Sequence, residues 1–482
     1  MEETKARQLH VFFFPFMAQG HTMPTMDMAK LFASRGLKAT IVTTSYYAQN
    51  FSKTIEKSRA FLGTQVEVLT IKIPCSEVGL PEGIESVHMV SSPENRLKFF
   101  EACGKLRPQL DHLLKRHRPD CLVADTFFPW APNVAAESGI PTLIFHSTGY
   151  FSLCASLCVF LYRPQTKVSS DSEPFIIPNL PDQIELTRDK LPVDFLREDL
   201  ETEFSSLYKA TRKMEMGGSY GVLVNSFYEL ESAYVDHYRK VLGVKSWQIG
   251  PLCLYNKRAR EAESSVDRHE CLKWLDSKTP NSVIYMSFGS VANFNDEQLM
   301  EIATGLEASG KLFIWVVKRE KKEGVKEEWL PEGFEGRMKG RGLIVRGWVP
   351  QVSILEHVAV GGFMTHCGWN STLEGVSAGV PMVTWPIAAE QFYNEKLVTQ
   401  VLRVGVEVSA KKFVRMVGDN VKREAIEKAV RRVMEGEEAE QMRSRVKGLA
   451  ELAKRAVEEG GSSCLDLNKL IEELTQHRSN SS

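Results

Sequence analysis

The hydrophobic positions of the chain form short apolar runs that alternate with amphipathic stretches. In the first half, apolar runs of strand length occupy residues 9–16, 37–44, 120–125 and 140–146, and residues 24–36 have helical periodicity. Strands that alternate with helices form parallel sheets with helices on both faces. The pattern therefore predicts an α/β fold built on a doubly wound parallel sheet.

A charged, weakly apolar stretch at residues 255–270 interrupts this alternation, which then resumes. The later predicted elements are strands at 282–290, 311–318, 343–349, 360–365 and 381–386 and a helix at 296–308. Because 482 residues exceed what one core usually supports, we expect two domains, at 1–254 and 271–461, with 255–270 as the linker. A last helix is expected to start at Ser462 or Ser463, and the final residues, 477–482, are expected to be frayed.

Composition narrows the class of protein. The 60 basic and 61 acidic residues nearly cancel, which argues against a nucleic-acid binder or a membrane-surface protein. Nine cysteines without a C-x-x-C pair favour a reducing compartment. Acidic residues near the start, together with Pro15 and Gly20, favour a first core strand over a signal peptide, and residues 142–161 favour a buried strand and helix over a membrane span. We expect a cytoplasmic protein and, from its balanced surface, a monomer.

The predicted strand 360–365 runs through the turn HCGW into a helix. A strand followed by a glycine turn and a helix N-terminus binds phosphate, because unpaired N–H groups and the helix dipole favour an anion. Asn370 and Ser371, at the expected cap and first turn, and His366, at the strand end, would face that anion. The alternative for Asn370 and Ser371 is an ordinary helix cap.

Three further groups around this turn suit the other parts of a nucleotide sugar. Glu374 lies on the same helical face as the anion site, one turn deeper, where it would accept hydrogen bonds from ribose hydroxyls. Trp348 and Gln351 offer an indole face for a base and an amide for a ribose or base edge. Glu390 and Gln391, beyond the strand 381–386, would hold adjacent hydroxyls of a hexose. Each group alone is also explained by packing or by a solvated helix start, but the combination indicates a nucleotide site.

Residues 348–391 resemble the signature segment of the plant secondary-product glycosyltransferases of family 1, with its initial W-x-P-Q, its HCGWNS and its closing E-Q. The stretches FPFMAQGHTMP, ADTFFPW and SFGS extend the resemblance over nearly the whole chain. It implies a GT-B fold, in which two Rossmann-like domains with parallel sheets face each other across a cleft. It also implies UDP-sugar donors, inverting transfer to small acceptors, and a final helix, 462–482, that returns towards the first domain.

The resemblance also implies roles for individual donor-binding residues. Trp348, with Val349 beside it, would stack on uracil, Gln351 and Glu374 would bind ribose, His366, Asn370, Ser371 and Ser290 would hold the diphosphate, and Trp369 (through its backbone), Glu390 and Gln391 would grip the sugar. In this family a closing Gln accompanies a preference for UDP-glucose, so we expect glucose as the transferred sugar. UDP-glucose would be a co-substrate, and no cofactor is expected.

His21 follows the first predicted strand, and Pro24 after it suits the first turn of a helix. Asp125 ends the strand 120–125, at the same edge of the sheet. Alone, each has an ordinary structural explanation, but both match the family's His–Asp dyad. His21 would deprotonate an acceptor hydroxyl, Asp125 would stabilise the resulting imidazolium, and the β-glucoside and UDP would follow. The helix N-terminus and His366 would neutralise the phosphates, and the lack of a D-x-D triplet fits chemistry without a metal.

The acceptor side is less specific. Five side chains near the strand ends of the first domain could line a pocket for a flat apolar molecule, although each could equally be core: Phe14, Met17, Phe127, Phe128 and Phe145. The N-terminal motifs resemble the subgroup that acts on flavonoids, triterpenoids and steroid-like hormones. The alternatives are transfer of another sugar (glucuronic acid, galactose or xylose) and a non-catalytic protein that binds a UDP-sugar or an acceptor. The sequence leaves the acceptor and its glycosylated position open.

Overall fold

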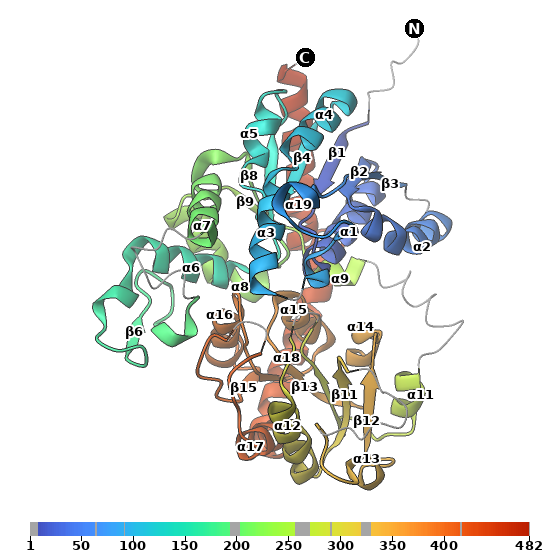
Figure 1. Ribbon diagram of the computed structural model, residues 1–482, viewed down its shortest axis with the longest axis vertical. Helices are drawn as coiled ribbons and strands as arrows, with labels where there is room; N and C mark the ends of the chain where they lie inside the picture. Colours follow the sequence, from blue (N-terminus) through green and yellow to red (C-terminus); the bar gives the residue numbers. More distant parts are fainter. Residues whose placement is uncertain are drawn as a thin grey trace.

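The computed structural model describes residues 8–62, 65–90, 92–192, 203–255, 270–289, 292–319, 329–414 and 417–481. Two parallel sheets, each covered by helices, form two lobes that lie one above the other in Figure 1. The doubly wound α/β architecture predicted from the sequence is therefore confirmed. Residues 256–269 of the expected linker, and Ser290, lie outside the described ranges.

The first lobe contains a parallel sheet of seven strands in the order β3-β2-β1-β4-β5-β8-β9. Its strands are β1 (His10–Phe14), β2 (Lys38–Thr43), β3 (Val66–Thr70), β4 (Cys121–Asp125), β5 (Thr142–His146), β8 (Gly221–Val224) and β9 (Ser246–Gln248). Its helices are α1 (Gln19–Ser34), α2 (Ser45–Leu62), α3 (Pro93–Gly104), α4 (Arg107–His117), α5 (Ala131–Ala136), α6 (Tyr150–Tyr162), α7 (Glu203–Lys213), α8 (Tyr228–Asp236) and α9 (Leu252–Tyr255). A small antiparallel hairpin, β6 (Pro174–Ile176) and β7 (Glu185–Thr187), projects to one side (Figure 1).

The second lobe contains a parallel sheet of six strands in the order β12-β11-β10-β13-β14-β15. Its strands are β10 (Val283–Ser287), β11 (Leu312–Val317), β12 (Gly342–Arg346), β13 (Val360–Thr365), β14 (Met382–Thr384) and β15 (Gly405–Glu407). The remaining helices are α11 (Glu270–Asp276), α12 (Asp296–Ser309), α13 (Phe334–Arg337), α14 (Gln351–Leu355), α15 (Trp369–Ala378), α16 (Gln391–Lys396), α17 (Arg423–Met434), α18 (Gly436–Val457) and α19 (Ser462–Ser481).

The central strands are buried along their whole length. Every residue of β1, β4, β5, β10 and β13 is buried, because helices cover both faces of each parallel sheet. This is why these strands have continuous apolar sequences rather than alternating ones. Residues 142–161, in particular, form β5 and most of α6. Within the described ranges, no helix is both long and apolar enough to cross a membrane.

Each sheet has one point where the order of its strands reverses. In the first sheet this point lies between β1 and β4, and in the second it lies between β10 and β13. Ligands of open parallel sheets bind beyond the carboxyl ends of the strands at such points. A ligand is therefore expected to bind at the segments that follow these four strands.

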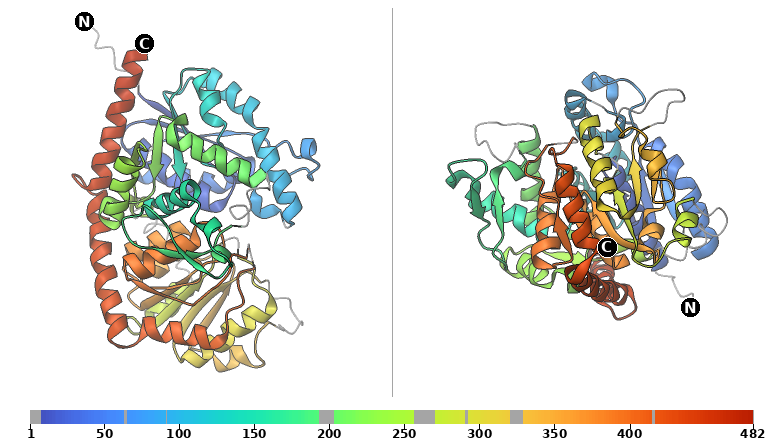
Figure 2. Two further views of the ribbon diagram at one scale, coloured as in Figure 1. Left: turned by 90° about the vertical axis from the view of Figure 1, so that its left-hand side faces the viewer. Right: turned by 90° about the horizontal axis from the view of Figure 1, so that it is seen from below.

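The two C-terminal helices run along one side of both lobes (Figure 2). Helix α18 contacts α15 of the second lobe and α8 of the first, and α19 packs on β9. The carboxylate of Asp466 on α19 accepts hydrogen bonds from the Arg239 guanidinium (2.5 Å) and from the backbone N–H of Gln248 (3.0 Å). These contacts tie the end of the chain to the first lobe.

The expectation of a frayed tail at 477–482 is wrong, because α19 continues to Ser481. Its last turns contact the first lobe. The ring of His477 meets Tyr220 edge-on, with centroids 5.6 Å apart, and the Arg478 guanidinium lies 3.8 Å from the Asp120 carboxylate. Tertiary contacts of this kind are not visible in local composition.

Replacement Asp466→Asn should destabilise the docking of α19, because a half-buried guanidinium then loses its anionic partner. Hydrogen bonds to charged groups contribute about 1.5–3 kcal/mol, so the midpoint of thermal unfolding should fall by roughly 2 °C or more. The matched control is Glu451→Gln, which removes an exposed pair with Lys454 on α18 and should leave the midpoint unchanged. Equal midpoints for Asp466→Asn and wild type would show that α19 is not held by this contact.

Candidate active site

A cleft of about 1800 Å³ lies where the carboxyl ends of the strands of the two sheets face each other. Of the sequence-predicted site residues, its wall includes His21, Phe127, Trp348, Val349, Gln351, His366, Trp369, Asn370, Ser371, Glu374 and Glu390. Asp125 and Gln391 lie outside this wall. Segments that are more than 300 residues apart in the sequence thus meet in one cavity.

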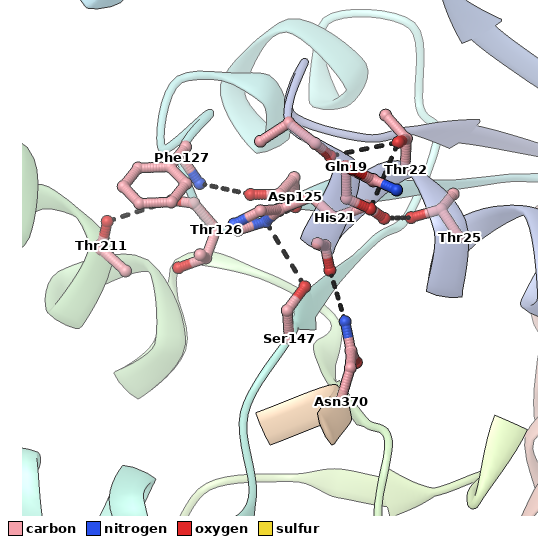
Figure 3. Close-up of polar contacts among 12 residues, drawn as sticks. Gln19, His21, Thr22, Thr25, Asp125, Thr126, Phe127, Ser147, Thr211 and Asn370 are labelled. Carbon is pink, nitrogen blue, oxygen red and sulfur yellow. Dashed lines mark hydrogen bonds and ion pairs between the residues drawn. The ribbon is translucent and has the colours of Figure 1, made fainter. Parts of the chain in front are cut away.

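His21 lies in the first turn of a helix rather than on a loop. Helix α1 begins at Gln19, five residues before the predicted start at Pro24, so that Pro24 lies inside it. A proline has no N–H, and therefore the carbonyl of Gly20, four residues earlier, receives no hydrogen bond from within the helix. That carbonyl instead accepts a 2.8 Å hydrogen bond from the Asn370 side-chain amide of the second lobe (Figure 3).

His21 and Asp125 form a buried hydrogen-bonded pair. The Nδ1 atom of His21 lies 2.7 Å from Oδ2 of Asp125, which is fully buried (Figure 3). The other carboxylate oxygen accepts a hydrogen bond from the backbone N–H of Phe127. An ionised carboxylate only accepts hydrogen bonds, so Nδ1 carries the proton and Nε2 is left to receive one. The pair therefore has the arrangement of a general base with its orienting acid.

Most of the residues predicted to line an acceptor pocket are core residues instead. Phe14, Met17, Phe128 and Phe145 are at most 1% exposed, and the rings of Phe14 and Phe128 stack with centroids 4.2 Å apart. They lie on or next to strands whose two faces are both covered, so they have no face left for a ligand. Phe127, which follows β4 on a loop, lines the cleft, with its ring centroid 5.3 Å from that of His21.

The side of the cleft formed by the first lobe also contains a histidine that was not among the predicted site residues. His146, at the end of β5, lines the cleft, and its Nε2 lies 2.5 Å from the carboxylate of Glu215. That carboxylate also pairs with the guanidinium of Arg212 at 2.6 Å. Burial raises the pKa of Glu215, but attraction to Arg212 and His146 more than offsets this and lowers it. The sequence could have indicated His146, because it lies one residue beyond Phe145, which pairs with Asp125 on the neighbouring strand.

The anion-binding turn has the predicted strand, turn and helix, but the helix starts earlier. Strand β13 occupies the predicted range, and α15 begins at Trp369 with Gly368 at the cap, so Asn370 and Ser371 are its second and third residues. The imidazole of His366 packs between Gly289 and Gly368. A Cβ at either glycine would come within 2.7 Å or 2.5 Å of that ring. Glycine is needed at both positions so that the ring fits beside the helix N-terminus.

The surroundings of His366 disfavour a positive charge on its imidazole. Burial, reinforced by the positive charge of Lys318, lowers its pKa to about 4. Its Nδ1 has no hydrogen-bond partner among the described residues. The imidazole is therefore placed to offer an N–H donor, and its predicted contact with phosphate stays a prediction. Lys318, just after β11, is one of the cations in the cleft wall, as are Lys30, Arg319 and Arg346.

The residues predicted to bind the nucleobase and the ribose all line the cleft. Trp348 is 73% exposed in the cleft wall, so one face of its indole is available to a planar ligand. The Gln351 amide donates to Glu374 (2.7 Å) and to Ser371 (3.1 Å), and its oxygen accepts from the Tyr285 hydroxyl (3.0 Å). The two residues predicted to bind ribose are thus joined by a hydrogen bond.

Of the two acidic and amide residues predicted to bind the sugar, one lines the cleft and the other supports it. Glu390 is the cap residue of α16 and faces the cleft, and its carboxylate accepts the backbone N–H of Trp369 at 3.2 Å. The oxygen of Gln391 accepts the N–H groups of Ile387 and Ala388, at 2.8 and 2.9 Å. Gln391 therefore fixes the loop before α16. Its predicted contact with the sugar has no counterpart in the cleft wall.

Trp369 joins the two lobes. Its indole Nε1 donates a 2.7 Å hydrogen bond to the carbonyl of Asn225 in the first lobe. The same ring packs against Gly149, where a Cβ would lie 2.5 Å from it. From the sequence, only the backbone of Trp369 was predicted to take part in the site. The contact of its indole with the first lobe was not predicted, because a contact between distant segments leaves no local pattern.

Comparisons with known proteins show to which family the chain belongs. The profile of the family described as "UDP-glucoronosyl and UDP-glucosyl transferase" matches residues 109–447. The chain is 55% identical to "UDP-glucose flavonoid 3-O-glucosyltransferase 7" of Fragaria ananassa, over 98% of both chains. It is 53% identical to "Scopoletin glucosyltransferase" of Nicotiana tabacum, over 98% of this chain and 99% of that one. The chain belongs to this family of UDP-sugar glycosyltransferases.

Solved structures confirm the GT-B fold of this glycosyltransferase. The chain is 40% identical to Glycyrrhiza uralensis UGT73P12, complexed with glycyrrhetinic acid 3-O-monoglucuronide, with a TM-score of 0.89 over 98% of this chain and 97% of that one. It is 28% identical to Medicago truncatula UGT71G1, complexed with UDP-glucose, with a TM-score of 0.77 over 97% and 98%.

The charges around the glycosyltransferase cleft raise the pKa of His21. Burial lowers the pKa of its imidazole, but the charge and hydrogen bond of Asp125, with a smaller contribution from Glu390, raise it above the ordinary value of 6.5. Burial raises the pKa of Glu390, although His21 opposes this. Among the described residues, no three His, Cys, Asp or Glu side chains gather as metal ligands would.

Replacement Asp125→Asn should shift the pH profile of glycosyl transfer. A base must be neutral, so kcat/KM is lost as the pH falls through the pKa of His21, and this acidic limb should lie above pH 6.5 in the wild type. Removing the carboxylate charge lowers that pKa, so the limb should move to lower pH while the maximal rate falls at least about a hundredfold. The control Asp111→Asn, in an exposed pair on α4, should change neither. An unmoved limb would contradict the electrostatic coupling.

Proposed function

We propose that the protein transfers glucose from UDP-glucose to a hydroxyl of a small, hydrophobic plant metabolite (a flavonoid, triterpenoid or steroid-like compound) and forms a β-O-glucoside. The observation that carries this proposal is the His21–Asp125 pair, which faces the helix N-terminus of α15 across one cleft. A protein that only bound UDP-sugars would need the helix N-terminus and Trp348 but would not need a base.

The chemical step is a single displacement. Nε2 of His21 takes the proton of the acceptor hydroxyl, whose oxygen forms a bond to the anomeric carbon of UDP-α-glucose. The bond from that carbon to the β-phosphate oxygen breaks, and its electron pair leaves with UDP. Because attack and departure occur on opposite faces, the anomeric configuration inverts. Asp125 stabilises the imidazolium that forms, and the proton is then released to solvent.

Charge on the departing UDP is stabilised by the second lobe. The backbone N–H groups at the start of α15 are not paired within the helix and point towards an anion at its N-terminus. His366 adds a neutral N–H donor, and Lys318 adds a positive charge to the wall. Protein groups alone therefore offer stabilisation of the diphosphate, which supports a metal-independent reaction.

Acceptor and donor specificity are proposed from the relatives. Three of these relatives are named for their acceptors, which are a flavonoid, scopoletin and an anthocyanin. The complex of UGT73P12 with a monoglucuronide makes UDP-glucuronic acid the first alternative donor. UDP-galactose and UDP-xylose are further alternatives. We propose glucose because Gln391 closes the signature segment.

The remaining parts of the proposal concern the whole chain. We propose domain limits at 1–254 and 271–461, with 462–482 as the returning helix, because each large sheet lies within one range and α19 packs on β9. All nine cysteines lie in the described ranges and are free, which supports work in the reducing cytoplasm. We propose that the protein acts as a monomer.

Replacement His21→Ala should abolish transfer and leave UDP binding nearly unchanged. The test is release of UDP from UDP-glucose with a panel of flavonoids, coumarins and triterpenoids, with products identified by mass spectrometry. Calorimetry with UDP shows whether the cleft is intact. Parallel reactions with UDP-glucuronic acid, UDP-galactose and UDP-xylose separate the donor alternatives. Wild-type rates in the His21→Ala enzyme would exclude His21 as the base.

Replacement Trp348→Ala should weaken UDP binding, because the base loses its stacking surface. Stacking of a base on an aromatic side chain contributes about 1–3 kcal/mol, so the dissociation constant of UDP should rise roughly 5- to 150-fold. The conservative Trp348→Phe should recover most of the affinity. Equal affinities of Trp348→Ala and the wild type would show that the exposed indole has another role.

A further inference from the structure

Asn394, on α16, is a buried polar residue that the mechanism above does not use. It is fully buried, and α16 packs against α6 of the first lobe. Buried amides are retained only where their hydrogen-bonding capacity is satisfied, because an unpaired polar group costs free energy. Its partners therefore indicate what it does.

The amide of Asn394 contacts three separate parts of the active site. Its Nδ2 donates to the carbonyl of Cys367 (2.8 Å) and to Oε1 of Glu390 (3.3 Å). Its Oδ1 accepts a 2.6 Å hydrogen bond from the hydroxyl of Ser152 on α6. One side chain thus connects the anion-binding turn, the sugar-binding carboxylate and the opposite lobe.

The orientation of this amide is determined by its neighbours. A backbone carbonyl and a carboxylate both accept hydrogen bonds, so the NH₂ group must face Cys367 and Glu390. The oxygen then faces Ser152, whose hydroxyl is able to donate. An aspartate at this position would place an oxygen against two acceptors.

The contact leaves one oxygen of Glu390 for the cleft. Oε1 accepts from both Asn394 and the backbone N–H of Trp369, and Glu390 lines the cavity. With Oε1 held in this way, Oε2 is the oxygen that remains for a hydroxyl of the sugar. The direction of this carboxylate therefore depends on Asn394.

We infer that Asn394 is a positioning residue for the sugar of the donor, which acts by fixing the carboxylate of Glu390. This inference rests on the proposed function, since it takes Glu390 to bind the sugar. Ser152 completes the arrangement from the first lobe. Helix α6 is itself held, because the Glu231 carboxylate accepts the N–H groups of Tyr150 and Phe151 at its first turn. The sugar-binding carboxylate of one lobe is thus aligned by a contact with the other.

The experiment compares four variants with the wild type: Glu390→Gln, Asn394→Asp, the double variant and Ser152→Ala. KM and kcat are measured for UDP-glucose, and the dissociation constant is measured for UDP. Asn394→Asp should reduce kcat/KM for UDP-glucose roughly tenfold or more, and should weaken UDP binding less. When Glu390 is already Gln, adding Asn394→Asp should have a much smaller effect, because both changes act on one interaction.

Ser152→Ala tests the same inference with a change that the fold tolerates. It leaves Oδ1 of Asn394 without its donor and should reduce kcat/KM for UDP-glucose roughly threefold, again with less effect on UDP. The matched control is Ser309→Ala on α12. Ser309 and Ser152 are each 2% exposed, but Ser309 bonds to the carbonyl of Leu306 and to the N–H of Lys311. The control should match the wild type.

The outcomes separate the inference from the proposed function. If Glu390→Gln keeps wild-type kinetics with UDP-glucose, the assignment of Glu390 to the sugar fails. If Glu390→Gln is impaired while Asn394→Asp and Ser152→Ala are not, only the positioning role fails. The positioning role would also fail if the loss of kcat/KM in the double variant equalled the product of the losses in the two single variants. If Asn394→Asp does not fold, Ser152→Ala and its combination with Glu390→Gln decide the question in the same way.

Discussion

All strands of a parallel sheet end at the same edge, and this constraint determines where the active site can form. The two large sheets of this protein turn their carboxyl edges towards each other, and each reverses its strand order near its middle. The loops that begin at these reversals therefore share one cleft. His21 and Asp125 come from the reversal in the first sheet, and His366 comes from that in the second. A base and an anion site that are far apart in sequence meet because both sheets are parallel.

Residues predicted to contact the donor, and Asn394 beside them, also hold the lobes together. Trp369 offers its backbone N–H within the cleft and its indole to Asn225 on the other side. Asn370 belongs to the helix N-terminus and also reaches the carbonyl of Gly20. Asn394 supports Glu390 and also meets Ser152. Side chains at the predicted donor site thus also join the lobes, so we expect an exchange at any of these positions to affect assembly as well as binding.

The sequence predicted what depends on local pattern. The bounds of β13 and the start of α16 at Gln391 follow from short apolar runs and turn residues, and the proximity of His21 and Asp125 follows from strand ends at one edge. The start of α1 was misplaced because Pro24 is typical of a first helical turn, whereas here Ala18 caps the helix with extended backbone and no side-chain hydrogen bond. The core phenylalanines, the neutral His366 and the docked C-terminus depend on contacts between distant segments, which local composition does not record.

The hydrogen bond between Asn370 and Gly20 links the helix N-terminus of the second lobe to the first lobe. The Asn370 side chain has one NH₂ group, which donates to the Gly20 carbonyl of the first lobe. A diphosphate that draws this group to itself competes with the contact between the lobes. By thermodynamic linkage, the free energy by which such an anion would weaken the contact equals the free energy by which the contact would weaken binding of that anion. Through Pro24, which has no N–H to offer the Gly20 carbonyl, an imino acid in the first lobe thus leaves the acceptor that orients an amide of the second.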